Sequence, residues 1–163
     1  MDFMEVLLKR RSIRKYKPEP VPDELLEQVL EAARLSPSGK NMQPYHFVVV
    51  KDNETKMKID PKTAHAPVII VGLVDPTKGR CSIPDGILAF EHIILGAVNA
   101  GLGSCWKGTY LGHLQEHEQE IKEVLKIPEH IAVVAYTPIG YPDEAPDMRS
   151  KKPLREIVHY DHW

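Results

Sequence analysis

The stretch PDGILAFEHIILGAVNA, residues 84–100, carries the strongest structural signal in the sequence. Its large apolar side chains follow helical spacing and give the predicted helix one broad apolar surface: Ile87, Phe90, Ile94, Leu95 and Val98. The sequence Gly101-Leu102-Gly103 follows and is expected to end the helix, because glycine adopts the backbone conformation of a helix C-terminus without strain. A helix this apolar needs much cover. In a chain of 163 residues, a dimer interface is a natural place to provide it.

Weaker signals on both sides of this helix predict further helices and strands. Helices are expected over residues 2–9, 22–35 and 114–126, and strands over residues 45–50, 67–74 and 131–139. The tail from residue 153 to residue 158 is expected to add a short strand. Helices and strands interleave, but they do not follow a strict βαβ rhythm.

Composition indicates an ordinary globular chain, with 42% hydrophobic and 27% charged residues and a net charge of −2. This near-neutral balance argues against general affinity for nucleic acid. The first 17 residues nevertheless hold six Lys/Arg against two acidic residues, and the C-terminal tail is basic as well. Two basic termini on such a protein suit a small anionic ligand. The N-terminus lacks the pattern of a signal peptide, no apolar run is long enough to span a membrane, and there are only two cysteines, so a cytoplasmic protein is expected.

The basic N-terminal region centres on the segment Arg10-Arg11-Ser12-Ile13-Arg14. An Arg side chain presents a planar fork of donors that matches phosphate oxygens, and the Ser hydroxyl adds another donor. These residue types together therefore indicate a phosphate-binding segment. A solvated basic turn remains the alternative.

A second polar segment, Pro37-Ser38-Gly39-Lys40-Asn41-Met42-Gln43-Pro44, is expected to be a loop. Asn41 and Gln43 each carry a donor and an acceptor, so they suit the edge of a heteroaromatic ring or sugar hydroxyls. An ordinary loop capped by Ser and Asn is the alternative.

Other motifs have better structural explanations. The glycines of residues 101–108 lack the spacing and the preceding strand of a dinucleotide-binding loop. His113 and His117 lack an evident third ligand and are expected to be surface histidines rather than a zinc site. Cys105 lies in an apolar stretch and is expected to be a buried structural cysteine. No catalytic side chain and no metal site is predicted, and neither a G-x-S-x-G elbow nor a Walker loop occurs.

Four segments of the chain, taken together, resemble the nitroreductase family of FMN-dependent NAD(P)H oxidoreductases. They are the stretches RRSIRKY (residues 10–16), SPSGKNMQPYHF (36–47), GLGSCWKG (101–108) and KKPL (151–154). Their order and spacing match the family over nearly the whole chain. The protein is therefore identified as a short-chain member.

This resemblance implies the residues of a site for tightly bound FMN. In relatives, the first segment binds the phosphate and ribityl chain, the second lines the flavin from the other subunit, the third brings backbone amides to flavin N5, and the basic tail returns to the phosphate. The residues implied are Arg10, Arg11, Ser12 and Arg14; Pro37, Ser38, Asn41 and Gln43; Lys107 and Gly108; and Arg149, Lys151 and Lys152.

The resemblance also implies the fold and the reaction. The fold would be α+β, a three-layer α/β/α sandwich with a mainly antiparallel central sheet, in which residues 1–163 form one domain of an interlocked homodimer. FMN at the dimer interface would pass hydride from the co-substrate NAD(P)H to nitroaromatic, quinone or similar small-molecule acceptors by a ping-pong mechanism. The alternative is a flavin-binding carrier, sensor or flavin-modifying protein without general reductase activity. Because residues 51–65 and 75–84 are short for the family, either an open site or one shaped by a different partner contact is expected.

Overall fold

The computed structural model describes residues 1–109 and 115–163 and has an antiparallel sheet as its middle layer. The strands lie in the order β1-β2-β5-β3, and β4 also pairs with β5. Their bounds are β1 Tyr45–Val50, β2 Val68–Val74, β3 Gly103–Ser104, β4 Lys107–Gly108 and β5 Ala132–Gly140. Every pair of neighbouring strands is antiparallel, as the family resemblance implies.

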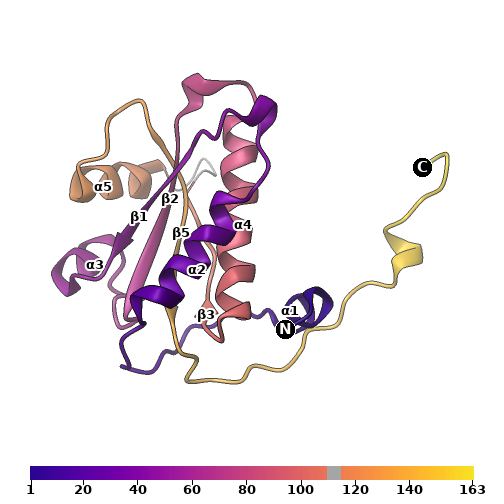
Figure 1. Ribbon diagram of the computed structural model, residues 1–163, viewed down its shortest axis with the longest axis horizontal. Coiled ribbons are helices and arrows are strands. Elements are labelled where there is room, and N and C mark those ends of the chain that lie inside the picture. Colours follow the sequence, from indigo (N-terminus) through magenta and orange to yellow (C-terminus); the bar gives the residue numbers. More distant parts are fainter. Residues whose placement is uncertain (110–114) are drawn as a thin grey trace.

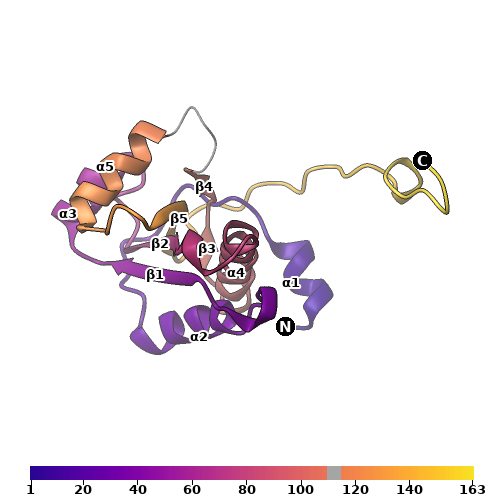
Figure 2. The same ribbon diagram turned by 90° about the horizontal axis from the view of Figure 1, so that it is seen from above.

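Helices cover the two faces of this sheet (Figure 1). The helices are α1 Phe3–Lys9, α2 Asp23–Arg34, α3 Asn53–Ile59, α4 Ser82–Asn99 and α5 Gln115–Leu125. α2 and α4 pack on one face, whereas α3 and α5 pack on the other, as the view from above shows (Figure 2). The result is a three-layer α/β/α sandwich.

The middle strand β2 explains how one sheet supports two cores. All seven of its residues are buried, because β1 and β5 flank it and helices cover both of its faces. Ile70 belongs to the core under α2 and α4, while its neighbour Val71 belongs to the core under α3 and α5. Successive side chains of a strand point to opposite faces, so an unbroken apolar run fills both cores.

Helix α4 is covered by its own chain on only part of its surface. Phe90, Ile93 and Ala97 are fully buried against α2 and the sheet. On the outer side, Ile87 and Leu88 remain 38% and 49% exposed. The expectation that this helix needs additional cover therefore agrees with the surface that the single chain leaves open.

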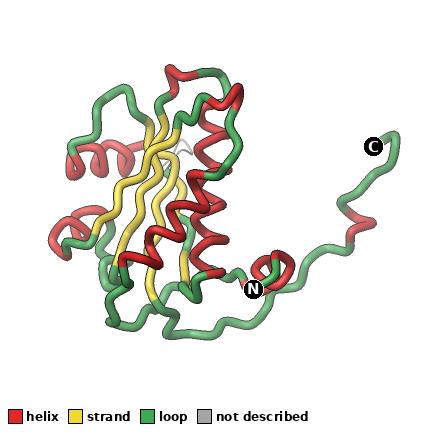
Figure 3. The backbone as a smooth tube through the Cα atoms, in the orientation of Figure 1, coloured by secondary structure: helices red, strands yellow, loops and turns green. Residues whose placement is uncertain are grey.

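The predicted helices and strands lie where expected to within about two residues, apart from the tail. The strand expected over residues 153–158 is wrong: Leu154–Glu156 form a single 3-10 turn on an extended arm (Figure 3). The arm leaves the sheet after β5, and its side chains from Lys151 onward are exposed. A strand needs a neighbouring strand to bond with, and residues 153–158 pair with no other described residue of the chain. Within the described ranges, none of the helices combines the length and apolar character needed to cross a membrane.

Candidate functional site

The arginine segment lies against strand β3. Ser12 forms a parallel bridge with Ser104, and the amide of Ile13 donates to the carbonyl of Ser104 at 2.8 Å. A Cβ atom on Gly103 would lie only 2.8 Å from Cβ of Ile13, so the glycine permits this close approach. The segment is thus held as a strand-like edge and not as a solvated turn.

Two side chains from distant parts of the chain fix the backbone at Arg14. The Glu144 carboxylate accepts the backbone N–H groups of Arg14 and of Lys15, the latter at 3.1 Å. These hydrogen bonds, led by the one from Arg14, lower the pKa of Glu144. On the other side, Nε2 of His65 lies 3.0 Å from the Arg14 carbonyl. Since a carbonyl only accepts, this nitrogen must carry the proton. The backbone that bears the Arg14 side chain is therefore held from both sides.

The C-terminal arm starts beside the same segment. Nη1 of Arg11 donates to the Pro146 carbonyl at 3.2 Å, and the Asp143 amide donates to the Lys15 carbonyl at 3.0 Å. Beyond this point, the three basic residues predicted to return to the phosphate are exposed on the arm: Arg149, Lys151 and Lys152. In the described parts of the chain, no hydrogen bond or ion pair joins these three to the arginine segment.

Arg10 ends helix α1 and faces helix α4. Its amide donates to the Val6 carbonyl at 3.0 Å, which closes the helix. Burial raises the pKa of Glu91 on α4, and the nearby charge of Arg10 opposes that rise. The arginine segment therefore extends from α4, which Arg10 faces, to β3, which Ser12 contacts, and forms a continuous basic surface.

The polar loop predicted to line the flavin is built around its own side chains. Oγ of Ser38 accepts the amide of Gln43 at 2.9 Å, and the Gln43 side-chain amide donates to Oδ1 of Asn41 at 3.0 Å. Pro37 precedes this network, and Oδ2 of Asp85 accepts the Gly39 amide at 2.9 Å. Asp85 lies in the first turn of α4, so it ties the loop to that end of the helix.

Three non-glycine residues of this loop have left-handed backbone conformations. The φ angles are 52° for Lys40, 57° for Asn41 and 46° for Gln43. Such conformations are uncommon outside glycine, and they persist only where surrounding contacts impose them. Three among four consecutive residues make this loop a candidate for function on backbone grounds as well as on composition.

The single chain does not bring the loop and the arginine segment together. Gly39 is bonded to Asp85 in the first turn of α4, whereas Ser12 lies beside Ser104, beyond the opposite end of the same helix. A helix of 18 residues is about 27 Å long. The two segments accordingly lie at opposite ends of the sandwich (Figure 1).

Strand β4 borders a cavity of about 590 Å³. Lys107 and Gly108 both line the cavity, and they pair with Tyr136 and Ala135 of β5, respectively. Trp106 also lines the cavity, and its ring meets that of Phe90 on α4 edge to face, with ring centroids 5.1 Å apart. We call this space the β4 cavity. The other lining residues are Met57, Lys58, Ile59, Asp60, Pro61, Lys62, His117, Glu120 and Tyr136.

A chain of hydrogen bonds forms one wall of the β4 cavity. The Tyr136 hydroxyl donates to Oδ2 of Asp60 at 2.9 Å, and Nε2 of His117 lies 3.2 Å from the same hydroxyl. Nδ1 of His117 lies 3.2 Å from Oε2 of Glu120. Burial, followed by the hydrogen bond and charge of Asp60, raises the pKa of Tyr136 well above its usual range, so this phenol stays protonated.

These contacts bear on two predictions. His117, expected to be a surface histidine, is 27% exposed, and its ring is hydrogen-bonded to Tyr136, so it lies only partly at the surface. His113 lies outside the described residues. The prediction that Cys105 is buried is confirmed, at 6% exposure. Within the described ranges, no group of three His, Cys, Asp or Glu residues is placed to hold a metal ion.

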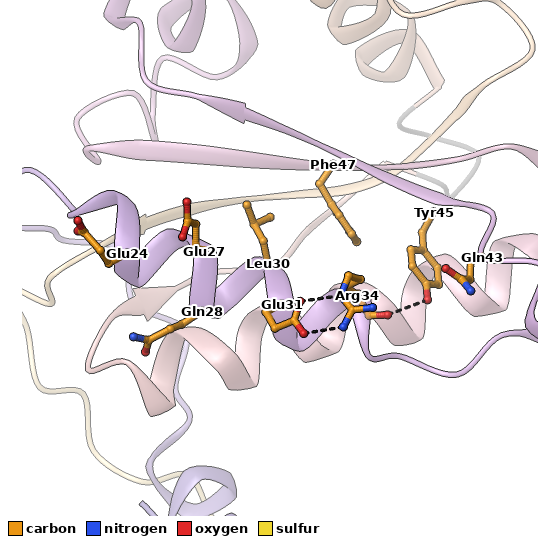
Figure 4. A pocket seen from close by; sticks show the side chains of 9 residues that line it. All are labelled: Glu24, Glu27, Gln28, Leu30, Glu31, Arg34, Gln43, Tyr45 and Phe47. Carbon is orange, nitrogen blue, oxygen red and sulfur yellow. Dashed lines mark hydrogen bonds and ion pairs between the residues drawn. The ribbon is translucent and has the colours of Figure 1, made fainter.

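A larger cavity of about 940 Å³ lies elsewhere, between helix α2 and the start of β1 (Figure 4). Gln43 is the residue that it shares with the predicted site. The Arg34 guanidinium pairs with Glu31, and the Tyr45 hydroxyl donates to the Arg34 carbonyl at 3.3 Å. With Glu24 and Glu27 also in the wall, the lining is acidic. Such a surface does not suit a phosphate-bearing cofactor.

The residues along β3 suit the phosphate end of FMN in their chemistry. Arg11 uses one nitrogen on Pro146 and keeps the other donors of its guanidinium for a ligand. Beside Ser12, the buried hydroxyl of Ser104 has no hydrogen-bond partner among the described residues. A row of guanidiniums with hydroxyls at its centre is a donor set that matches a phosphate and its polyol chain.

Comparison with known proteins identifies the family of this chain. The model of the Nitroreductase family matches residues 7–69 and 55–141. A relative from Methanothermobacter thermautotrophicus, named NADH dehydrogenase/NAD(P)H nitroreductase, is 35% identical over 173 residues, which cover 100% of this chain and 88% of the relative. A protein of the same name from Archaeoglobus fulgidus is also 35% identical and covers 99% of both chains. Among solved structures, an FMN-dependent nitroreductase from Clostridium difficile superposes with a TM-score of 0.89 at 32% identity, over 99% of this chain and 100% of that one.

The matched residues include the arginine segment, the polar loop and strand β4, which are the three parts described above. The likeness also extends over nearly the full length of both the relatives and the solved structure. The chain belongs to the nitroreductase family.

Proposed function

We propose that this protein is an FMN-dependent oxidoreductase that passes hydride from NAD(P)H through flavin N5 to nitroaromatic, quinone or similar acceptors, in ping-pong order. The observation that carries the proposal is the arginine segment, whose backbone is fixed at Arg14 by Glu144 and His65. A near-neutral protein that fixes three arginines along one strand edge is suited to a small phosphate-bearing ligand. The names of the relatives, which include NAD(P)H nitroreductase and FMN-dependent nitroreductase, support both cofactors.

Each part of the chain then has a separate task in binding. Arg10, Arg11 and Arg14 hold the phosphate, and Ser12 holds the ribityl chain. Three basic residues of the arm add positive charge around the phosphate once the arm folds back on its own chain or docks on a partner. They are Arg149, Lys151 and Lys152. These assignments rest on the bridge that holds Ser12, and with it the arginine segment, against β3, and on the contact of Arg11 with Pro146 where the arm departs.

When bound, FMN supplies the atom that accepts and donates hydride, and the protein positions it. The backbone of Lys107 and Gly108 lies at the wall of the β4 cavity, where an amide hydrogen bond to N5 would orient the ring. The polar loop from Pro37 to Gln43 supplies donors and acceptors for the ring edge. No side chain needs to act as an essential acid or base in this scheme.

The site requires a second copy of the chain, because the loop and the arginine segment lie at opposite ends of α4. Several exposed apolar side chains are available to bury in such a dimer. Phe3 and Met4 of α1 are 68% and 60% exposed, and Leu88 of α4 is 49% exposed. The arm also presents apolar residues that find no cover on the chain itself, such as Leu154 at 73% exposure. Interfaces of obligate homodimers are built from such surfaces.

An absorbance spectrum of the purified protein tests the proposal directly. Flavin bands that bleach with NADH in the absence of oxygen, and return when a quinone is added, are expected. Arg14→Ala should lose bound FMN, while its FMN-free form keeps the circular dichroism spectrum and unfolding curve of the FMN-free wild type, because the Arg14 side chain is exposed. A protein that takes up no FMN would contradict the cofactor assignment. Bound flavin that NADH does not reduce would favour a carrier, sensor or flavin-modifying protein.

Mixing two variants tests whether one site draws on both chains. Arg14→Ala and Asn41→Ala alter opposite ends of α4, so each homodimer would contain two damaged sites. A mixed dimer would contain one site damaged twice and one site intact. Refolding the two variants together should therefore restore FMN binding to about half of the mixed dimers' sites. Absence of any recovery, with mixed dimers present, would mean that one chain provides the whole site.

A further inference from the structure

The first residues of the C-terminal arm run antiparallel to the arginine segment and its continuation. We call residues 141–146 the arm root. The Lys17 amide donates to the Tyr141 carbonyl at 2.9 Å, and Tyr16 forms an antiparallel bridge with Pro142. The contacts described above for the start of the arm continue the same pairing. Two stretches that are distant in the sequence are thus held side by side.

A single carboxylate oxygen joins these two stretches at Arg14. Oε1 of Glu144 accepts the backbone N–H groups of both Arg14 and Lys15. The two N–H groups belong to the peptide units on either side of the Arg14 Cα atom. The hydrogen bonds therefore set the direction in which the Arg14 side chain leaves the backbone. His65 adds to this restraint, because it binds the carbonyl of the second peptide unit.

The charge of Glu144 acts against an anionic ligand at the same place. The hydrogen bond from the Arg14 amide lowers the pKa of Glu144, so its carboxylate is ionised at neutral pH. A negative charge beside the arginine segment weakens the attraction of that segment for a phosphate. If charge alone mattered, removing the carboxylate would strengthen phosphate binding. If the position of Arg14 matters more, the same change would weaken it.

We propose that Glu144 is a positioning residue for the FMN phosphate, and that its hold on the Arg14 backbone outweighs the repulsion from its own charge. This inference rests on the proposed function, which gives the Arg14 side chain the task of holding the phosphate. Glu144 acts through Arg14 and does not touch the ligand. The arm root is then part of the cofactor site, in addition to the basic residues further along the arm.

Competition between FMN and riboflavin tests the proposal without any turnover. Riboflavin has the same ring and ribityl chain but no phosphate. Dialysis of the purified protein against a mixture of the two, followed by chromatography of the bound flavins, therefore measures the preference for the phosphate. The wild type should prefer FMN. Glu144→Ala should lower this preference about tenfold, which corresponds to losing roughly one hydrogen bond to a charged group.

Two further variants separate position from charge. Glu144→Gln loses the charge but keeps a carbonyl oxygen that can accept both amides, so its preference should stay within about threefold of that of the wild type. Asp147→Ala is the matched control. Asp147 is exposed next to the arm root, and no hydrogen bond or ion pair joins its side chain to another described residue. Removing its charge should not lower the preference.

Each other result would overturn the inference. An unchanged preference in Glu144→Ala would do so even if both flavins bind more weakly, because a general distortion of the site affects both alike. A higher preference in both Glu144 variants would show that repulsion outweighs positioning. A wild type that binds no flavin, or that does not prefer FMN to riboflavin, would instead refute the proposed function and this inference with it.

Discussion

Replacing Tyr136 with phenylalanine removes one hydroxyl from the junction between the core and the β4 cavity. Tyr136 is 5% exposed, and its hydroxyl donates to the carboxylate of Asp60, which is itself only 9% exposed. A hydrogen bond to a charged group contributes about 1.5–3 kcal/mol, and the buried oxygen would be left without this donor. Oδ1 of Asp60 keeps the Lys62 amide, so the carboxylate is not stranded. We expect Tyr136→Phe to lower the free energy of unfolding by about 2 kcal/mol at pH 7.

The same hydroxyl predicts how this difference changes in alkali. Burial and Asp60 raise the pKa of Tyr136 in the folded state above the value of about 10 that a tyrosine has in the unfolded chain. Below pH 10 the stabilising contribution is fully present. Above pH 10 the unfolded chain loses its phenolic proton while the folded protein keeps it, so the contribution falls. The stability difference between wild type and variant should therefore shrink by about 1 kcal/mol between pH 10 and pH 11.

Urea unfolding at pH 7, 10 and 11, followed by circular dichroism, measures both effects. Tyr160→Phe is the matched control, because Tyr160 lies on the arm and is 85% exposed. That substitution should change the free energy of unfolding by less than about 0.5 kcal/mol at every pH. A loss below about 0.5 kcal/mol for Tyr136→Phe at pH 7 would refute the argument. So would a difference between wild type and variant that stays constant from pH 10 to pH 11.

Two further predictions concern the core and the clamp on the arginine segment. A Cβ atom on Gly72 would lie 2.4 Å from Cδ2 of the fully buried Phe90, so Gly72→Ala should cost about 1–3 kcal/mol in urea unfolding. Adding Phe90→Leu should recover part of that loss, and no recovery would mean that the clash is not the cause. Glu144 has a lowered pKa in the folded state, because it accepts the amides of Arg14 and Lys15. Its contribution is present above its usual pKa of 4.5 and is lost as the pH falls through the lowered value, so Glu144→Gln should flatten the acid side of the stability profile. An unchanged acid profile would show that the clamp does not stabilise the fold.

The sequence predicts the elements of this fold well wherever burial is decided locally. The run at residues 67–74 was expected to be a largely buried strand, and β2 occupies Val68–Val74. Helix α4 begins at Ser82, two residues before the predicted start, because Pro84 is compatible with a first helical turn and does not mark the boundary. The strand predicted over residues 153–158 is wrong because its apolar residues resemble those of a strand, whereas a strand also needs a neighbouring strand edge to pair with. Whether such an edge is near depends on the path of the chain after β5, and no local sequence pattern shows this.

The candidate site shows the same difference between local sequence patterns and contacts that are distant in sequence. Short segments with unusual residue types, such as the arginine segment and the polar loop, can be recognised from the sequence. Their supports cannot: Glu144 lies 130 residues from Arg14, His65 lies 51 residues from it, and Asp60 lies 76 residues from Tyr136. A lone Asp, Glu or His has no periodicity, and its partner is set by strand order and by the turn that follows α3. The sequence pointed to Lys107 and Gly108, but the other residues that line the β4 cavity, such as Asp60, Lys62 and Tyr136, were missed for that reason.

The geometry of α4 explains why half of the proposed site is placed at each of its ends. The polar loop is tied to the first turn through Asp85, and the arginine segment lies beyond the last turn, beside β3. If the open face of α4 packs on its copy about a two-fold axis, the two helices run antiparallel when that axis is perpendicular to them. The first turn of each then lies near the last turn of the other. A single self-complementary contact would thus create two identical sites, each with a loop from one chain and arginines from its partner. In this arrangement, packing of α4 on its copy accounts for two features at once. It covers the apolar face that a single chain leaves exposed, and it divides each site between two chains.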